Sequence, residues 1–252
     1  RYYINTRLVN ASTSPSGIND LIEDGNLITG SGDDFEFTYG TNRANPDSRH
    51  PYYAAQYETG NGPYMSNYLM WSMYLEQDLV DPRIRYYFYR QDGNVLDEDQ
   101  FTLDCVAAPF PQHYPVWMPF CTASDDGYWG RDHGDNSGIP PDGFKRTVYG
   151  LYPAGGKFDD DSFASTKNGG TDGAGGAGVT PIVLGSYVDF MLAEAALTLG
   201  TTGDARDYLE SAISKSIAKV TGFGAADPAF APTQADIDAY VANAMGRYDA
   251  AA

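Results

Sequence analysis

The sequence predicts a mainly α-helical protein with long, structured loops. The last third of the chain contains apolar stripes at helical spacing, which indicates packed helices. The preceding region is dominated by Pro, Gly and Asp, yet aromatic residues run through it, and a disordered segment would be poor in them. We therefore expect a single domain over residues 1–252, with a loop-rich part at 1–178 and a helical part at 179–252.

The first 60 residues are rich in Asn, Ser, Gly, Asp and Pro. Short apolar patches such as "NLITG" and "FEFTYG" interrupt this polar background. Turn-forming residues around short apolar runs are typical of loops and hairpins. We expect irregular structure here, with a short hairpin.

A helix is predicted over residues 64–79, where apolar and aromatic residues recur every three to four positions. Pro82 is expected to end this helix or to open a second short element, because proline cannot continue a helix. The alternation from Tyr86 to Tyr89 is compatible with a strand.

The last third predicts three further helices. Residues 181–200 place an apolar stripe along one side and end at Gly200, a residue type that favours helix C-termini. A short turn leads to a second helix over 205–222, so these two should form an antiparallel hairpin. A third helix begins near Thr233, which has the spacing of a capping box with Asp236.

The charge of the chain excludes several partners. Its 34 acidic and 16 basic residues give a net charge of −18. Nucleic acids need Lys and Arg to neutralise phosphates, so we expect no nucleic-acid partner. An anionic membrane surface is disfavoured for the same reason. No apolar run approaches the roughly 18 residues needed to span a bilayer, and no signal peptide is visible. Both ends look cut from a longer protein.

Common catalytic and cofactor-binding motifs either do not occur in the sequence or lack the structural context that they need. Gly173, Gly175 and Gly178 spell GxGxxG, but no strand precedes them, so we interpret this segment as a loop without a dinucleotide. The three His residues form no metal-binding pair, and no nucleophile elbow is present. A glycosidase needs two carboxylates, but with 34 acids candidate pairs arise by chance. We assign no catalytic residue.

The two cysteines, Cys105 and Cys121, leave two alternatives open. A disulfide between them would close a loop of about 15 residues and contribute about 3 kcal/mol. Two separate buried thiols fit equally well. A zinc site is not expected, because no further His or Cys stands at ligand spacing.

The stretches "KFDDDS" at 157–162 and "SDDG" at 124–127 are the candidates for a metal site. Asp159, Asp160 and Asp161 cluster the oxygen ligands that calcium prefers, although without the spacing of an EF-hand. The alternative is a solvated acidic loop. We therefore expect no cofactor other than a structural calcium at these residues.

Ligand contacts are expected from aromatic residues in loops, where no helical period requires burial. Sugar recognition pairs an aromatic face with planar polar side chains, and the loop "GYWGRDHGD" contains both. The alternative is that its Arg–Asp pair ties the loop to itself. The candidate ligand-binding residues are Tyr128, Trp129, Trp117, Arg131 and Asp132.

Four stretches resemble the SusD/RagB family of outer-membrane nutrient-binding lipoproteins, in its SusD-like branch. The longest is "GVTPIVLGSYVDFMLAEAALTLGTTGDARDYLESAISKSIAKV", residues 178–220. The others are "DPRIRYYF" at 81–88, "GYWGRDHGD" at 127–135 and "TVYGLYPAGGKFD" at 147–159. They follow the order expected in the family over roughly 150 residues.

The resemblance implies a SusD-like fold with a tetratricopeptide-like helical hairpin in the C-terminal third. It implies an outward-facing protein of the bacterial outer membrane, held by a lipid anchor not present in this chain. It also implies two partners, a SusC-like TonB-dependent transporter barrel and an oligosaccharide or other nutrient. Family members bind glycans for uptake and are not enzymes. They are about twice as long, so this chain resembles a fragment lacking both ends.

Three functions follow as hypotheses. The first is a glycan-binding subunit of an outer-membrane uptake complex, binding by aromatic stacking and polar contacts. The alternative from another class is a secreted carbohydrate-active enzyme that uses a carboxylate pair. The third is an interaction module that docks the transporter while glycan binding resides elsewhere.

Overall fold

The computed structural model describes residues 1–60, 62–76, 78–93, 108–116, 118, 120–121, 126–132, 145–166 and 170–251. These residues form two compact units. Unit 1 comprises Arg1–Phe37, Pro181–Gly222 and Ile237–Ala252, and unit 2 comprises Thr38–Thr180 and Phe223–Asp236. The first residues thus belong to the same compact unit as the helical segments near the C-terminus. The single domain over residues 1–252 stays a prediction. The described elements are α1 (Tyr2–Asn5), α2 (Thr13–Asp24), β1 (Phe35–Thr38), α3 (Pro51–Tyr57), α4 (Asn67–Tyr74), α5 (Ile84–Tyr87), β2 (Phe88–Tyr89), β3 (Val148–Tyr149), β4 (Val179–Val183), α7 (Gly185–Leu199), α8 (Ala205–Thr221) and α9 (Gln234–Ala251).

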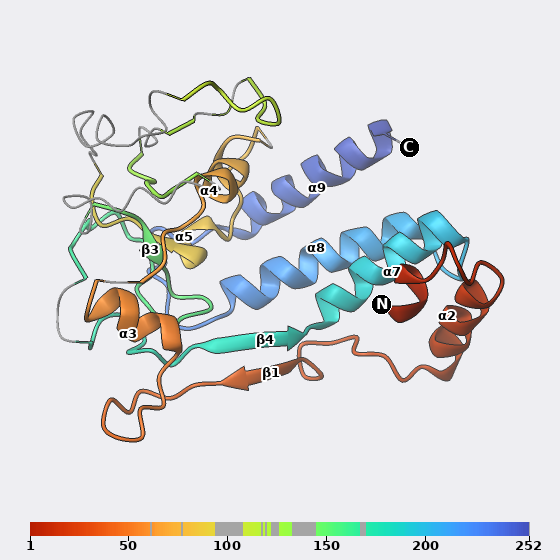
Figure 1. Cartoon of the computed structure of the whole chain (residues 1–252), viewed down its shortest axis with the longest axis horizontal. Coiled ribbons are helices and arrows are strands. Elements are labelled where there is room, and N and C mark those ends of the chain that lie inside the picture. The colour runs from red at the N-terminus through yellow and green to blue at the C-terminus, as the bar shows by residue number, and fades with distance from the viewer. Residues whose placement is uncertain are drawn as a thin grey trace. The chain divides into compact units, whose positions relative to one another are not determined.

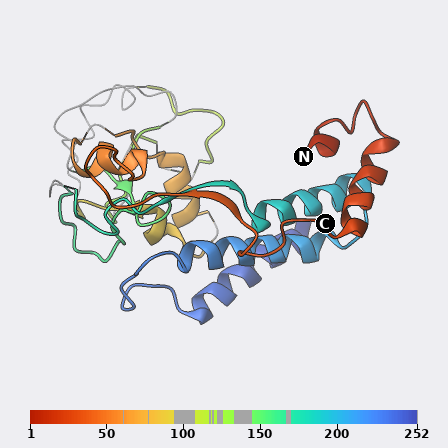
Figure 2. The same cartoon turned by 90° about the horizontal axis from the view of Figure 1, so that it is seen from below.

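Unit 1 is built around the hairpin of α7 and α8, which run side by side in both views (Figures 1 and 2). Its apolar cluster joins α1, α2 and α7 through Ile4, Ile18, Val188, Leu192 and Ala195. These buried positions on α7 recur at helical spacing, which explains why the sequence predicted this helix. The expected mainly helical fold is confirmed.

The helix ends at Gly200 and Thr233 have the predicted caps, and Asp204 caps a further helix end. Gly200 ends α7 in the left-handed region, at φ 64°, where a residue without Cβ is favoured. The Asp204 carboxylate accepts hydrogen bonds from the backbone N–H groups of Arg206 and Asp207 and begins α8. At α9, the Thr233 hydroxyl accepts from the Asp236 backbone N–H at 3.2 Å, which confirms the capping box.

Two expectations about the flanking segments were wrong. The first helix of the hairpin begins at Gly185, because Pro181–Val183 belong to β4. The first 60 residues are not irregular, since they contain the 12-residue helix α2. The strand β1 pairs with β4, far along the chain, and no local hairpin forms there. Helix α2 is poor in strong helix formers, so packing of Ile18 stabilises it more than propensity does.

Unit 2 contains short elements joined by loops. Strands β2 and β3 pair antiparallel, with Phe88 opposite Tyr149 and Tyr89 opposite Val148. The strand expected over 86–89 therefore begins only at Phe88, after helix α5. Helix α4 is shorter than the predicted 64–79, because Ser66 caps its first turn through a hydrogen bond from the Leu69 backbone N–H.

The glycine-rich segment of unit 2 serves backbone packing. Gly173 lies at φ 61°, and a Cβ there would be 1.9 Å from the Gly156 carbonyl oxygen. A Cβ on Gly178 would be 2.3 Å from the Pro153 carbonyl oxygen. At these two positions a backbone carbonyl oxygen lies so close that only glycine, which has no Cβ, can be accommodated. The interpretation of GxGxxG as a loop is confirmed.

Among the described residues, no helix has the length and apolar character required to span a membrane.

Candidate ligand-binding surface

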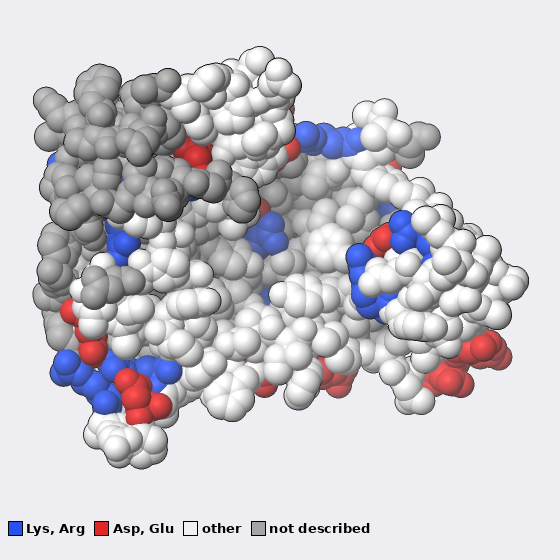
Figure 3. Space-filling view, viewed as in Figure 1, with Lys and Arg blue, Asp and Glu red and all other residues white. Residues whose placement is uncertain are grey.

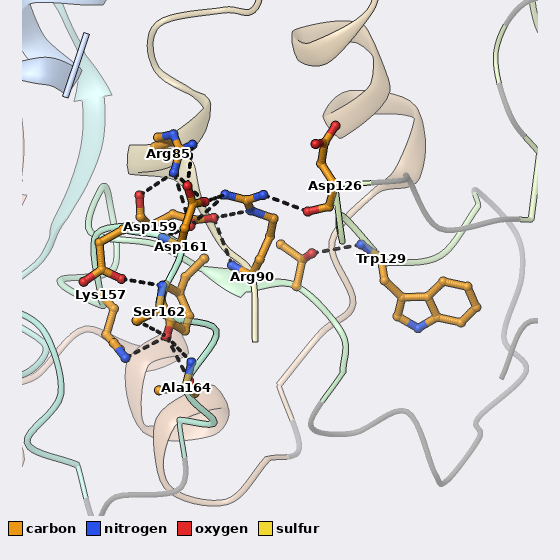
Figure 4. Close-up of polar contacts among 12 residues, drawn as sticks. Arg85, Arg90, Asp126, Trp129, Lys157, Asp159, Asp161, Ser162 and Ala164 are labelled. Carbon is orange, nitrogen blue, oxygen red and sulfur yellow. Dashed lines mark hydrogen bonds and ion pairs between the residues drawn. The ribbon is translucent and has the colours of Figure 1, made fainter. Parts of the chain in front are cut away.

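A buried ion-pair network holds the loops of unit 2 (Figure 4). Asp159 is fully buried, and its carboxylate accepts from Nε and Nη2 of Arg90 at 2.7 and 3.0 Å. Asp161 pairs with both Arg90 and Arg85, the latter at 2.9 Å. The Arg90 guanidinium also donates to the Asp126 carbonyl oxygen at 2.7 Å. One arginine thus joins the chain after β2 to two distant loops.

The protonation states of the network agree with this geometry. Burial opposes the charge on Arg90, but its hydrogen bonds to Asp159 raise the net pKa of the guanidinium. Burial likewise opposes the charge on Asp161, yet the hydrogen bond from Arg85 lowers the pKa of that carboxyl. Both groups are therefore held in their charged forms, which their ion pair requires.

The expected calcium cluster is not formed. Asp159 and Asp161 bind guanidinium groups, and Asp160 accepts from the Ser162 backbone N–H at 3.1 Å. Within the described ranges, no group of three or more His, Cys, Asp or Glu could hold a metal ion. The physical reason is that arginines occupy the carboxylate oxygens which calcium would need.

Asp132 anchors the loop that the sequence selected for ligand contacts. Its buried carboxylate accepts from the Tyr114 hydroxyl at 2.8 Å, the Cys121 backbone N–H at 2.8 Å and the Asn67 side-chain amide at 3.1 Å. Three donors satisfy this carboxylate, which explains how it is tolerated in the interior. Asp132 therefore connects its loop to other segments of the chain, which agrees with the alternative that this residue has a structural role.

Arg131 has the same positioning role. Its guanidinium lies over the Tyr64 ring at 4.0 Å from the centroid, a cation–π contact. Its Nη1 donates to the Gly130 carbonyl oxygen at 2.9 Å, and its backbone N–H donates to the Met65 carbonyl oxygen at 2.9 Å. The side chain is buried, so protein groups surround the guanidinium.

The two aromatic residues of this loop are interior. Trp129 has no exposed surface, and its backbone N–H donates to the Thr147 hydroxyl at 2.9 Å (Figure 4). Tyr128 is also buried and belongs to an apolar cluster, and burial raises the pKa of its hydroxyl. In this arrangement neither ring offers a face on which a sugar could stack. Trp117 lies outside the described residues.

Exposed aromatic rings lie instead around Tyr114, the residue that Asp132 holds. Tyr68 and Phe110 are 40% and 45% exposed, and their ring centroids lie 5.4 and 6.1 Å from that of Tyr114. Gln112 and His113, both exposed, add planar polar groups. We call Tyr68, Phe110, Gln112 and His113 the Tyr114 surface. Figure 3 is largely white where Figure 1 draws the yellow-green segment that contains Phe110, Gln112 and His113.

Sequence reasoning missed this surface for a definable reason. Tyr68 fell within the apolar pattern of a predicted helix, where an aromatic ring is expected to be buried. It lies on α4, but it points out of the core and contacts Tyr114. A useful signal was the run "FPQHY", which alternates rings with planar polar side chains.

Cys121 lies beside this surface and is disulfide-bonded. Its backbone is in the left-handed region at φ 59°, and its N–H donates to Asp132. The disulfide alternative therefore holds for Cys121. Cys105 lies outside the described residues.

Comparison with solved structures finds matches, and one of them is a SusD homolog. No protein-family model and no curated protein sequence matches the chain. A crystal structure of a SusD homolog from Bacteroides fragilis superposes with a TM-score of 0.55 at 15% sequence identity. The match covers 95% of this chain and 43% of that chain, so this chain spans less than half of the homolog. At this identity the similarity shows the fold, and the chain has a SusD-like fold.

Proposed function

We propose that this chain is part of a glycan-binding subunit of an outer-membrane uptake complex, and that it binds oligosaccharide without catalysis. The observation that carries the proposal is the SusD-like fold, which extends over 95% of the chain. The four sequence stretches that resemble the SusD/RagB family support it independently. From the same resemblance we propose a SusC-like TonB-dependent transporter as partner, a lipid anchor outside this chain, and tetratricopeptide-like packing of α7 and α8.

We place the oligosaccharide on the Tyr114 surface. The faces of Tyr68 and Phe110 suit the C–H side of a sugar ring, because that side is apolar. Gln112 and His113 carry donors and acceptors for hydroxyl groups. None of the four residues of this surface carries a full charge at pH 7 with His113 neutral, which suits a neutral ligand.

The buried contacts beneath this surface would organise it before the ligand arrives. Tyr114 is buried, and its hydroxyl donates to Asp132, so the ring against which Tyr68 and Phe110 pack is fixed. A preorganised surface loses less side-chain freedom on binding and therefore binds more tightly. This gives Asp132 a role in binding that needs no contact with the ligand.

The test is a titration of the whole chain with a panel of oligosaccharides, followed by intrinsic fluorescence and by calorimetry. We expect saturable binding of one member, weakened about tenfold or more by Tyr68→Ala and by Phe110→Ala, which corresponds to about 1.4 kcal/mol per ring. Tyr2→Ala is the matched control, because Tyr2 is a 68% exposed ring in unit 1. This control should bind like the parent.

Chromatography of the same mixtures tests the absence of catalysis. Intact oligosaccharide after prolonged incubation supports a binding protein. Cleavage products would contradict the proposal and favour the carbohydrate-active enzyme. If Tyr68→Ala and Phe110→Ala bound the oligosaccharide as tightly as the parent, the ligand would not bind at the Tyr114 surface. If no oligosaccharide of the panel bound, glycan binding by this chain would be contradicted.

A further inference from the structure

Unit 1 contains a polar pocket at the N-terminus of α7, which follows β4 in Figure 1. Its volume is about 180 Å³. The side chains that give it chemical character are Asp34, Ser186, Lys215 and Lys219, together with the backbone of Gly185. We call it the α7 pocket. None of these residues belongs to the Tyr114 surface, which lies in unit 2.

Ser186 is the feature that distinguishes this pocket from an ordinary helix end. The residue is 3% exposed, and among the described residues its hydroxyl has no hydrogen-bond partner. A buried hydroxyl is normally paired, because leaving it without a partner is costly. The neighbouring Gly185 backbone N–H is already satisfied by the Asp34 carboxylate at 2.8 Å. The hydroxyl is thus the group left for a ligand.

The two lysines keep donor capacity for a ligand. The Lys219 ammonium contacts Asp34 at 3.0 Å and Glu36 at 2.8 Å. The Lys215 ammonium contacts Asp189 at 2.5 Å. An ammonium group has three N–H donors, so Lys219 retains one and Lys215 retains two. The carboxylate of Asp34, which lines the pocket, has further lone pairs and can also accept from a ligand.

The charges argue against an anion. Three carboxylates, Asp34, Glu36 and Asp189, face two ammonium groups, which leaves a net charge of −1. The N-terminus of α7 adds roughly half a positive charge. The pocket is therefore close to neutral and gives an anion little net attraction, although it offers donors and acceptors side by side.

We propose that the α7 pocket binds a small, neutral polyhydroxyl compound of about the size of a single sugar ring. Each hydroxyl of such a compound donates and accepts, which matches lysine and serine donors that alternate with carboxylate acceptors. A volume of 180 Å³ divided by the ~30 Å³ share of one water corresponds to about six waters. That space is of the size of a small molecule.

Calorimetric titration of the whole chain tests the proposal, with D-glucose, D-galactose, D-xylose, myo-inositol and inorganic phosphate as separate probes. We expect saturable one-site binding of at least one of the four polyols and none of phosphate. Ser186→Ala should weaken this binding at least fivefold. Ser16→Ala is the matched control, because Ser16 is an exposed serine of the same unit, and it should bind like the parent.

Thermal unfolding separates a ligand role from a structural one. The midpoint of Ser186→Ala should equal or exceed that of the parent, because no described protein group loses a hydrogen bond. A lower midpoint would show that the hydroxyl has a protein partner and would contradict the premise. Binding of phosphate alone, binding of no polyol, or equal affinity in Ser186→Ala would each overturn the proposal.

The Tyr68→Ala variant distinguishes this proposal from the proposed function. It should lose affinity for oligosaccharide while it binds the small polyol like the parent. Ser186→Ala should show the reverse pattern. If both variants lost both ligands, the two sites would not be separate, and the α7 pocket would not be a site of its own.

Discussion

The same type of ion pair occurs in both units with different surroundings. In unit 1, Arg206 donates to Asp249 at 2.7 Å, and the two side chains are 40% and 50% exposed. In unit 2, Arg90 donates to Asp159 at 2.7 Å, and the two side chains are 6% and 1% exposed. Water and salt screen the first pair, whereas the second has exchanged its hydration for protein partners. The two ion pairs have the same N–O distance, but we expect the buried pair to contribute more to the stability of the fold.

The difference matches how each unit is built. Unit 1 is organised by apolar faces of helices, and its exposed Arg206–Asp249 pair adds little to them. Unit 2 has short elements, so Arg90 must connect β2 to the loops around Asp126 and Asp161. A loop-rich unit thus depends on a few buried polar contacts, whereas the helical unit adds its partly buried ion pairs to apolar helix packing.

The largest effect is expected for Asp159→Ala. Removing this carboxylate leaves Arg90 buried beside an incomplete network, and breaking such a pair costs about 3–5 kcal/mol. Urea denaturation followed by fluorescence would measure the free energy of unfolding. Asp249→Ala is the matched control, because it removes the same chemical group from an exposed pair. We expect no resolvable change for it. Equal destabilisation by the two variants would remove the contrast between the units.

A smaller effect is expected from the pH dependence of His50. This side chain caps α3 by accepting a hydrogen bond from the Tyr52 backbone N–H at 3.3 Å, which requires a neutral imidazole. Burial lowers the pKa of His50 in the folded protein below its ordinary value of 6.5. Below about pH 6.5 the unfolded chain binds the proton more readily. Stability is therefore present above this pH and is lost as the pH falls toward the folded pKa.

The test compares the parent with His50→Asn between pH 7 and pH 5. Asparagine can also cap a helix but does not titrate in this range. We expect the parent to lose at most about 1.4 kcal/mol per pH unit relative to the variant. Urea midpoints at several pH values give this difference. Parallel pH profiles for the two proteins would show that His50 does not titrate with folding.

The contrast between the units also explains what the sequence could predict. Helices α7 and α8 were predictable because spacing, Gly200 and Asp204 are local signals that agree with the packing. Helix α2 was missed because its residues have weak propensity, and only contact with α1 and α7 stabilises it. Where tertiary contacts stabilise a helix, the local sequence pattern does not predict it.

The candidate site shows the same limit. Tyr128 and Trp129 stand in a loop and show no period that would indicate burial. Their burial follows from contacts with residues far along the chain, including the Thr147 hydroxyl that accepts from the Trp129 backbone. Tyr68, in contrast, looked interior by its helical spacing and is exposed. The tying role of Arg131 and Asp132 was among the alternatives because such pairs commonly satisfy one another or the backbone.

The smallest effect is expected for Ile217→Val in unit 1. Ile217 is a buried residue of α8, and the change removes one methyl group without introducing a polar atom. Such substitutions cost about 0.5–1.5 kcal/mol. No ionisable group is involved, so the loss should be the same at pH 7 and pH 5 and at low and high salt. Urea denaturation under the four conditions would measure it. If Ile217→Val lost as much free energy of unfolding as Asp159→Ala, the contrast between the units would be contradicted. Removal of one buried methyl group in the helical unit would then cost as much as removal of a buried carboxylate in the loop-rich unit.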